Sequence, residues 1–480
     1  MFINIKMTKT LNDTQQVAYD KIMTFLTCII EKRSITTDYI NLPNKFFLLD
    51  GAGGCGKTFI IKKLISNLNN SPIKHRLLAP THKACNILRS SGIKHVETIA
   101  KFLGYNQEVQ EDGTKKTVYK FIKEIYKDID ILIIDECSMI SKIQVKMLLE
   151  TNKPIIFVGD DAQLNPISEE KSEIYLLNFE DKHTLDKNMR SRNQELSDYI
   201  FDVRASSLNN KIDKHLLDNH RKIKNEDEFI NKIKDSFLKE SDTVVLAWTN
   251  KAVNKYCDTI RSLLFKKEVS EKLEKYYAGE KLSVKEYFVY QTNGAKKFYT
   301  NDIIEIKKVE ITEVKVFYPR CMCEDSERIG KKCDQCFTKN HKDPYKIIKF
   351  YKLYFEDDIY FFSPYDETNE KELNSVLLCF KDRCKELSNS IKLETDSKKI
   401  QCLKERAIRE WKAYYWMVIK YDAPLNYTYS MTVHKAQGSG YKNVFVHLSN
   451  IYLNRDLPER CKMIYTAFSR ASEELSFYNF

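Results

Sequence analysis

The stretch 46–61, FFLLDGAGGCGKTFII, leads from one apolar segment through a glycine-rich turn into another. GxxxxGK[ST] between an apolar strand and a helix start predicts a phosphate-binding loop, in which backbone amides surround a polyphosphate. Lys57 supplies a cation for the β- and γ-phosphates, and Thr58 offers a hydroxyl to Mg²⁺. Glycine is needed in the turn because a Cβ would obstruct the phosphates. The turn consists of Gly51, Ala52, Gly53, Gly54, Cys55 and Gly56. This stretch therefore predicts a binding site for a nucleoside triphosphate.

Length and charge set the outer limits for the rest of the chain. With 480 residues the chain exceeds what one hydrophobic core normally supports, so we expect about two to four domains. It carries 78 lysines and arginines against 67 aspartates and glutamates, a net charge of +11. This excess suits a polyanionic partner, although a lysine-rich surface is more often simply solvated.

No apolar run approaches the ~20 residues that span a bilayer, and residues 1–16 lack the apolar centre of a secretory signal. We therefore expect a soluble intracellular protein without a membrane partner, in the cytoplasm or the nucleus. The 13 cysteines are then expected to be reduced or to bind metal. Abundant lysine, isoleucine and asparagine with little glycine and proline indicate an AT-rich coding genome, such as that of a DNA virus.

Polar side chains that suit a nucleotide and a sugar-phosphate backbone flank the phosphate loop. Residues 11–30 have helical apolar spacing, and Gln15 in the first turn can donate to and accept from the edge of adenine. A strand at 76–79 ends in Pro80, Thr81 and His82, which open a helix and suit contacts with a nucleic-acid backbone. A solvated glutamine and a simple helix cap are the plain alternatives.

Two further apolar strands end in polar residues. Residues 129–140, IDILIIDECSMI, place Asp135 and Glu136 at the end of a strand, where ligands of parallel sheets bind. One carboxylate can hold Mg²⁺ while the other polarises the attacking water. The strand 154–158 is followed by GDDAQLNPI, which places Gln163 at the same edge, near a γ-phosphate.

A hairpin is predicted at residues 107–118, because Asp112-Gly113 lies between strand-like segments. It is either a surface excursion or a wedge. A second α/β sheet is predicted to begin at the strand 243–247. Segments 298–311 and 345–362 read as β-rich, and apolar residues with helical spacing over 373–391 and 400–418 predict a helical hairpin.

A cysteine cluster lies between the two β-rich segments, at Cys321, Cys323, Cys333 and Cys336. Four thiolates in two chelating pairs suit tetrahedral zinc. His341 is an alternative ligand for one of the cysteines. The plain alternative is a cysteine-rich loop of free thiols.

Seven motifs taken together resemble a superfamily 1B DNA helicase of the Dda type, with its RecD and Pif relatives. They occur in the family's order: GAGGCGKT, APTH, IIDECSM, GDDAQLNPI, NMRS, TVHKAQG and YTAFSRA. The resemblance covers most of residues 11–196, 243–257 and 426–472. It does not cover the cysteine cluster or most of the helical hairpin.

The resemblance implies a role for each matching residue. The implied catalytic residues are Lys57, Asp135, Glu136, Gln163, Arg190 and Arg470, with both arginines reaching from the second RecA-like domain. Thr58 and Asp135 are implied ligands of Mg²⁺. The implied ATP contacts are Gln15, Gly51, Gly53, Gly54, Cys55, Gly56, Lys57, Thr58, Gln437 and Gly438. The implied contacts with single-stranded DNA are Pro80, Thr81, His82, Thr432 and His434.

We therefore expect an α/β fold with two RecA-like domains. The first is placed at residues 1–180, with an inserted hairpin subdomain at 97–128. The second is placed at 181–297 and 425–480. A β-barrel-like insertion with the cysteine cluster and the helical hairpin is placed at 298–424.

The expected function is that of an ATP-dependent 5′ to 3′ DNA helicase, and its polarity is implied by the resemblance alone. The expected ligands are ATP, Mg²⁺ and a structural Zn²⁺. The expected partners are single-stranded DNA, forked duplex DNA and replication or repair proteins docking on residues 312–420. A monomer is expected. Two alternatives remain open: a translocase that remodels protein–nucleic acid complexes or unwinds RNA, and a nucleic-acid-binding scaffold with a vestigial ATPase.

Overall fold

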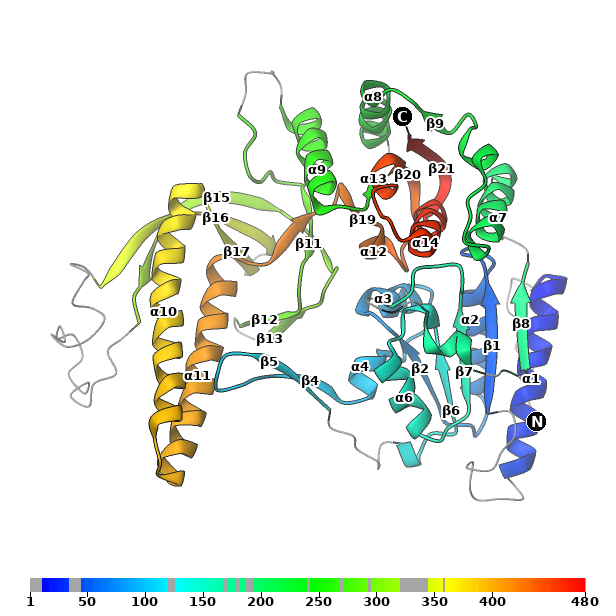
Figure 1. Ribbon diagram of the computed structural model, residues 1–480, viewed down its shortest axis with the longest axis horizontal. Helices are drawn as coiled ribbons and strands as arrows, with labels where there is room; N and C mark the ends of the chain where they lie inside the picture. The colour runs from blue at the N-terminus through cyan, green and yellow to red at the C-terminus, as the bar shows by residue number, and fades with distance from the viewer. Residues whose placement is uncertain are drawn as a thin grey trace. The chain divides into compact units, whose positions relative to one another are not determined.

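In a computed structural model, the chain divides into two units, whose helices and strands are drawn in Figure 1. The model describes residues 11–33, 45–119, 126–166, 169, 171–177, 179, 181–186, 193–239, 242–266, 272–291, 295–319, 344–356 and 359–479. Unit 1 contains residues 1–105, 119–269 and 428–480, and unit 2 contains residues 106–118 and 270–427. Among the described residues, no helix is both long and apolar enough to span a membrane.

The first sheet of unit 1 has six parallel strands in the order β3-β2-β6-β7-β1-β8. The strands are β1 (Phe46–Gly51), β2 (His75–Ala79), β3 (Val96–Thr98), β6 (Ile131–Ile134), β7 (Ile155–Gly159) and β8 (Asp181–Leu185). Its helices are α1 (Asp13–Arg33), α2 (Lys57–Leu68), α3 (His82–Ser90), α4 (Ile99–Phe102), α6 (Lys142–Glu150), η2 (Cys137–Met139) and η3 (Glu173–Leu176).

Both faces of this sheet are covered, which explains why its strands read as continuous apolar runs. Phe47 and Leu49 of β1 belong to the core shared with α1 and α2. Leu48, between them, belongs to a separate core on the opposite face. Such burial leaves the carboxyl ends of the strands as the place for polar chemistry.

The second sheet of unit 1 has five parallel strands in the order β19-β10-β20-β21-β9. They are β9 (Lys222–Ile223), β10 (Thr243–Ala247), β19 (Ser430–Thr432), β20 (Tyr441–His447) and β21 (Ala471–Tyr478). The helices are α7 (Gln194–Leu208), α8 (Glu226–Lys239), α9 (Asn250–Phe265), α12 (Val433–Ala436), α13 (Leu448–Ile451), α14 (Leu457–Phe468) and η4 (Lys214–Leu217). The predicted fold class, α/β with two parallel sheets, is confirmed.

The loop that follows β7 is shared between the two sheets. Asp160 directly follows this strand of the first sheet, but Ala162 and Leu164 are fully buried in the core of the second sheet. The amide of Leu164 donates to Thr466 Oγ1 of α14 over 3.2 Å. The segment that carries Gln163 is therefore packed as part of the second sheet.

Unit 2 combines small antiparallel sheets with two long helices. Its strands are β11 (Lys281–Val284), β12 (Phe288–Gln291), β13 (Ala295–Phe298), β14 (Ile303–Glu305), β15 (Lys308–Phe317), β16 (Tyr345–Glu356), β17 (Ile359–Pro364) and β18 (Leu425–Tyr427). The helices are α10 (Glu367–Leu393) and α11 (Ser397–Tyr421), which run side by side in Figure 1. They lie where the helical hairpin was expected.

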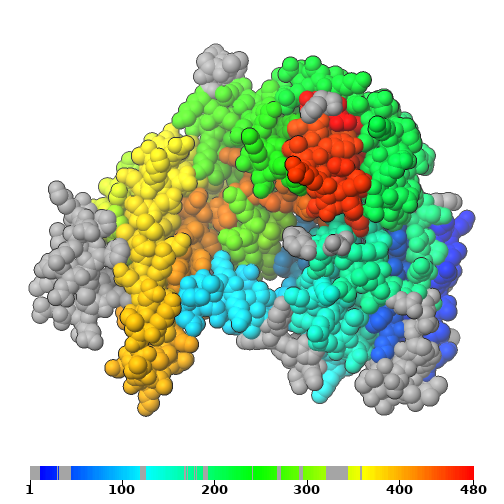
Figure 2. Space-filling model, in the orientation of Figure 1, coloured from blue at the N-terminus to red at the C-terminus, as the bar shows by residue number. Residues whose placement is uncertain are grey.

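The hairpin of β4 (Tyr105–Val109) and β5 (Lys115–Tyr119) packs against these helices, as Figure 2 shows. Gly113 at its turn has φ +83° and lies under the ring of Trp411, where an added Cβ would come within 2.5 Å of the indole. The hydroxyl of Tyr415 donates to Gly113 O over 2.6 Å. Lys404 pairs with Glu111 at 3.2 Å. The turn of the hairpin is therefore fastened to α11.

Two domain boundaries differ from those expected. Strand β8 begins at Asp181, where the second domain was expected, yet it pairs with β1 in the first sheet. Strands β11 and β12 precede residue 298 but belong to unit 2, because β11 pairs with β18 and β14. In both cases pairing between strands far apart in sequence decides the boundary. Cys321, Cys323, Cys333, Cys336 and His341 lie outside the described residues.

Candidate nucleotide site

The phosphate loop joins β1 to α2, as predicted. Gly54 and Gly56 have φ +91° and +88°, a conformation that favours glycine. Within the part of the chain that the structure describes, no side chain caps the start of α2, which leaves its first amides available to an anion. Lys57 Nζ donates to the carbonyls of Gly51 and Ala52 over 2.6 and 3.0 Å. Burial opposes its charge, but Cys55, Asp160, Glu136 and Asp50 together raise the pKa of the ammonium group.

Gln15 lies against this loop. Its Nε2 donates to Cys55 O over 3.1 Å, and its Oε1 accepts from the amide of Asn12 over 3.3 Å. A Cβ on Gly56 would collide with the Gln15 amide. The structure thus places Gln15 beside the nucleotide loop, and its role in reading adenine stays a prediction.

Asp135 and Glu136 follow β6, at the same edge of the sheet. Glu136 has φ +51°, a strained conformation for a residue with a side chain, and its Oε2 is buried with no hydrogen-bond partner among the described residues. Burial, reinforced by the charge of Glu136, raises the pKa of Asp135 to about 7. A divalent cation bound here would favour the ionised form of Asp135 and would give Glu136 Oε2 a partner. Together with the Thr58 hydroxyl, these hard oxygen donors fit Mg²⁺.

Arg470, in the turn between α14 and β21, brings a buried guanidinium from the second sheet to this loop. It donates to Thr466 O, Ser439 O and Ser469 Oγ over 2.9, 2.9 and 2.7 Å. An added Cβ on Gly53 would lie 3.7 Å from its Nη2. The two sheets therefore approach each other closely at Gly53, and a cation stands on the second-sheet side.

Gln163 and Gln437 lie in the contact between the sheets. Gln163 Nε2 donates to Asp160 Oδ2 over 3.3 Å, while its Oε1 is buried without a partner among the described residues. Gln437 Nε2 donates to Leu164 O over 3.1 Å, and Gly438 next to it has φ +74°. Arg190 lies outside the described residues.

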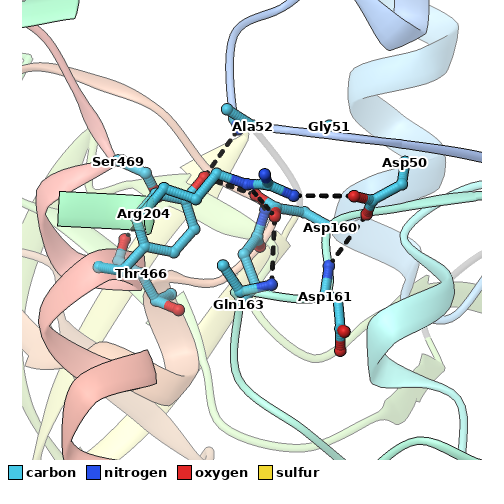
Figure 3. A network of polar contacts seen from close by, with 12 residues as sticks. Asp50, Gly51, Ala52, Asp160, Asp161, Gln163, Arg204, Thr466 and Ser469 are labelled. Carbon is cyan, nitrogen blue, oxygen red and sulfur yellow. Dashed lines mark hydrogen bonds and ion pairs between the residues drawn. The ribbon is translucent and has the colours of Figure 1, made fainter. Parts of the chain in front are cut away.

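Arg204 of α7 is a residue that the sequence did not single out. Its Nε donates to Asp160 Oδ1 and its Nη2 to Asp50 Oδ2, each over 2.9 Å (Figure 3). Burial opposes the ionised form of Asp160, but Arg204 and Lys57 outweigh it and lower the pKa. Asp50 could have indicated such a partner in the sequence, because a carboxylate at the end of an otherwise apolar strand needs a cation when it is buried.

Tyr465 of α14 was also missed, although it stands within the YTAFSRA motif. Its hydroxyl donates to Asp160 Oδ2 over 2.5 Å and accepts from the amide of Gly53 over 3.0 Å. This tyrosine therefore links the phosphate loop of the first sheet to a helix of the second. Burial raises the pKa of Tyr465 well above its usual value, so the phenol stays protonated as a donor.

The residues implied to contact single-stranded DNA lie on both sheets. Thr81 caps α3 by accepting from Ala84 N over 3.1 Å. Thr432 and His434 line a cavity of about 1210 Å³ within unit 1, and His434 pairs with Glu459 at 3.3 Å. Three lysines also line it: Lys171, Lys435 and Lys462. Pro80, Thr81 and His82, at the end of β2, are not among the residues that line this cavity.

Comparisons with known proteins agree with these motifs. A family model described as an AAA domain matches residues 32–227, and one described as a UvrD-like helicase C-terminal domain matches residues 427–478. The RecBCD enzyme subunit RecD of Buchnera aphidicola from Schizaphis graminum is 25% identical over 479 residues, 92% of this chain and 71% of that protein. The chain belongs to the Pif1/RecD-like superfamily 1B DNA helicases, a class of ATP-dependent enzymes.

Other helicases and one viral protein are similar to this superfamily 1B chain. ATP-dependent DNA helicase Pif1 of Campylobacter jejuni is 28% identical over 192 residues, 34% of this chain and 41% of that one. An uncharacterised protein of Acanthamoeba polyphaga mimivirus is 28% identical over 92% of this chain and 97% of its own length. Bacteroides Pif1, solved bound to single-stranded DNA, is 14% identical with a TM-score of 0.48, over 98% of this chain and 92% of that one.

Proposed function

We propose that the protein translocates 5′ to 3′ on single-stranded DNA and separates duplexes, driven by ATP hydrolysis between its two sheets. The observation that carries this proposal is the approach of the two sheets at Gly53, where Lys57 stands on one side and Arg470 on the other. A triphosphate bound there would be held by cations of both sheets. Cleavage of the γ-phosphate removes that shared anion, so the sheets can separate.

The chemistry is assigned to residues at the carboxyl ends of β1 and β6. Thr58 and Asp135 would hold Mg²⁺, which neutralises charge on the β- and γ-phosphates when bound. Glu136 has a buried carboxylate oxygen that finds no hydrogen-bond partner in the described parts of the chain, which suits it to orient the attacking water. Lys57 and Arg470, joined by Arg190 as a further proposal, stabilise charge on the transferred phosphoryl group.

DNA contacts are proposed on each sheet in turn. Pro80, Thr81 and His82 lie on the first sheet, and Thr432 and His434 on the second. Because the two groups of residues belong to separate sheets, each cycle in which the sheets close on ATP and separate after hydrolysis changes the distance between the groups. In the cavity beside Thr432, Lys435 is proposed to supply charge for a phosphate, whereas Lys171 and Lys462 there pair with Asp161.

The β4–β5 hairpin is proposed to be the wedge that separates the strands. A wedge must resist the force of the advancing duplex, and a free two-stranded hairpin is only marginally stable. The packing of Gly113 under Trp411 and the bond from Tyr415 stiffen this one.

Tailed duplexes test the proposed activity and its polarity. With ATP and Mg²⁺ we expect strand release from a DNA duplex with a 5′ single-stranded tail and little from a 3′-tailed one. We also expect the ATPase to be stimulated by single-stranded DNA more than by RNA. Release only from RNA duplexes, or DNA-stimulated ATPase without release, would favour the remodelling translocase. DNA binding without any ATPase would favour the scaffold.

A structural zinc ion on Cys321, Cys323, Cys333 and Cys336 remains a proposal from their spacing alone. Metal analysis of the purified chain is expected to give one zinc per molecule, and changing Cys333 and Cys336 to serine should abolish it. Protein with no bound zinc would leave the free-thiol alternative.

Docking of replication or repair proteins on residues 312–420 and a monomeric state are likewise proposed. A source in a DNA virus is supported by the mimivirus relative.

A further inference from the structure

Four charged side chains are gathered behind the phosphate loop. Asp50 and Asp160 are the carboxylates, and Arg204 binds both of them at 2.9 Å. Lys57 is the fourth member: its Nζ donates to the carbonyl of Gly51, the residue after Asp50, over 2.6 Å, and both carboxylates favour its charged form. The Arg204 and Asp160 side chains are 9% and 0% exposed, and that of Asp50 is 16% exposed. Within these four side chains two negative and two positive charges balance, and Glu136 outside the group also favours the charged form of Lys57.

A bound polyphosphate would disturb this balance, because it takes Lys57 as its own counter-ion. Among the described residues, Arg204 would then be the only cation paired with Asp50 and Asp160, whose remaining donors, such as Tyr465 and the amide of Asp161, are neutral. Buried carboxylates that lose their cation are strongly destabilised, so without Arg204 they would compete with the nucleotide for Lys57. Lys462, a nearby lysine, is engaged elsewhere, with Asp161 O at 2.6 Å and Asn165 Oδ1 at 2.9 Å.

The same carboxylates hold the loop that carries Gln163. Asp50 Oδ1 accepts from the amide of Asp161 over 3.1 Å, and Asp160 Oδ1 accepts from the amide of Ala162 over 3.3 Å. Arg204 itself comes from α7, whose Leu196, Ile200 and Val203 lie in the core of the second sheet. A residue of the second sheet therefore fixes the base of the phosphate loop and the loop beyond β7 together.

We propose that Arg204 is a positioning residue for nucleotide binding, which neutralises Asp50 and Asp160 so that Lys57 remains available to the polyphosphate. This inference rests on the proposed ATP site but goes beyond it, because Arg204 acts through Lys57. It predicts that loss of Arg204 lowers the nucleotide affinity through the uncompensated charge of the carboxylates. Neutralising one of the two carboxylates should then restore the affinity, even though the ion pair itself stays absent.

The test is titration of the full-length protein with a fluorescent ADP analogue in the presence of Mg²⁺. Arg204→Gln is expected to weaken binding about tenfold, in line with losing hydrogen bonds between charged groups. The double variant Arg204→Gln with Asp50→Asn is expected to return to within about threefold of the wild type. Arg221→Gln is the matched control, because Arg221 also pairs with a carboxylate, Glu195 at 2.8 Å, within the second-sheet part of unit 1. It should bind like the wild type.

Circular dichroism and thermal melting first establish that each variant is folded. Wild-type affinity in folded Arg204→Gln, or a double variant no better than the single one, would overturn the inference. If Arg204→Gln does not fold, the single variant Asp50→Asn tests the inference. It should bind the ADP analogue at least as tightly as the wild type. Weaker binding than the wild type would refute the competition of the carboxylates for Lys57. A wild-type chain that binds no nucleotide would instead refute the proposed function.

Discussion

Replacing Glu136 with glutamine is expected to lower the ATP turnover number about 10²–10⁴-fold, the range for loss of a general base. The substitution keeps the shape of the side chain but removes the carboxylate that would orient the attacking water. Its Oε2 is buried without a partner among the described residues, so no structural contact of that atom is lost. Nucleotide binding should persist, because Lys57 and the loop amides are untouched. The measurement is steady-state ATPase with saturating single-stranded DNA, together with nucleotide titration.

Glu173→Gln is the control for this prediction. Glu173 pairs on the surface with Lys142 at 2.6 Å, and exposed pairs of this kind contribute little to stability, so its turnover should match that of the wild type. Strand separation that survives in Glu136→Gln would show that hydrolysis at this carboxylate does not drive unwinding. Loss of nucleotide binding in the same variant would mean that Glu136 has a structural task instead.

Gly113→Ala is expected to slow duplex unwinding about tenfold while DNA-stimulated ATPase stays within about twofold of the wild type. The new Cβ would come within 2.5 Å of the Trp411 ring and would also sit at φ +83°. The hairpin must then lift off α11 and lose the bond from Tyr415 to Gly113 O. ATP hydrolysis relies on other residues, so the two activities should separate. Forked-duplex unwinding and ATPase, measured on the same preparation, check this.

Gly279→Ala isolates the effect of the contact from that of the backbone. Gly279 has the same φ of +83°, but an added Cβ there would meet no described atom within 4 Å. It lies in unit 2 as well, and its unwinding rate should remain close to that of the wild type. Hydrogen exchange over residues 106–118 reports whether the hairpin has loosened in Gly113→Ala. A loosened hairpin with unchanged unwinding would rule it out as the wedge.

The elements with strong local signals were predictable. The phosphate loop, the strand before Asp135 and the Asp112-Gly113 turn each combine an apolar run with residues of special backbone or charge chemistry. The assignment of β8 to the first sheet was not predictable, because its pairing with β1 joins residues about 130 positions apart. The same limit hid the start of unit 2, which depends on β18 pairing with β11.

Within the candidate site, the sequence identified residues that carry their chemistry in a motif. Lys57, Asp135 and Glu136 lie at one sheet edge, and Arg470 was implied by resemblance and lies beside Gly53. Arg204 was not identified, because an arginine on a helix is usually a solvated one. Only the crossing of α7 beside the ends of β1 and β7 turns it into the partner of Asp50 and Asp160.

The sequence by itself determined that the chain has a phosphate-binding loop and helicase motifs in family order. The loop can be recognised in this way because it is local: its glycines, lysine and threonine are neighbours along the chain. The tertiary structure alone decided which distant side chains complete that loop. Tyr465 reaches Gly53 across 412 positions, and Arg204 reaches Asp50 across 154. Such contacts follow from the packing of two sheets around a shared loop, which no local pattern encodes.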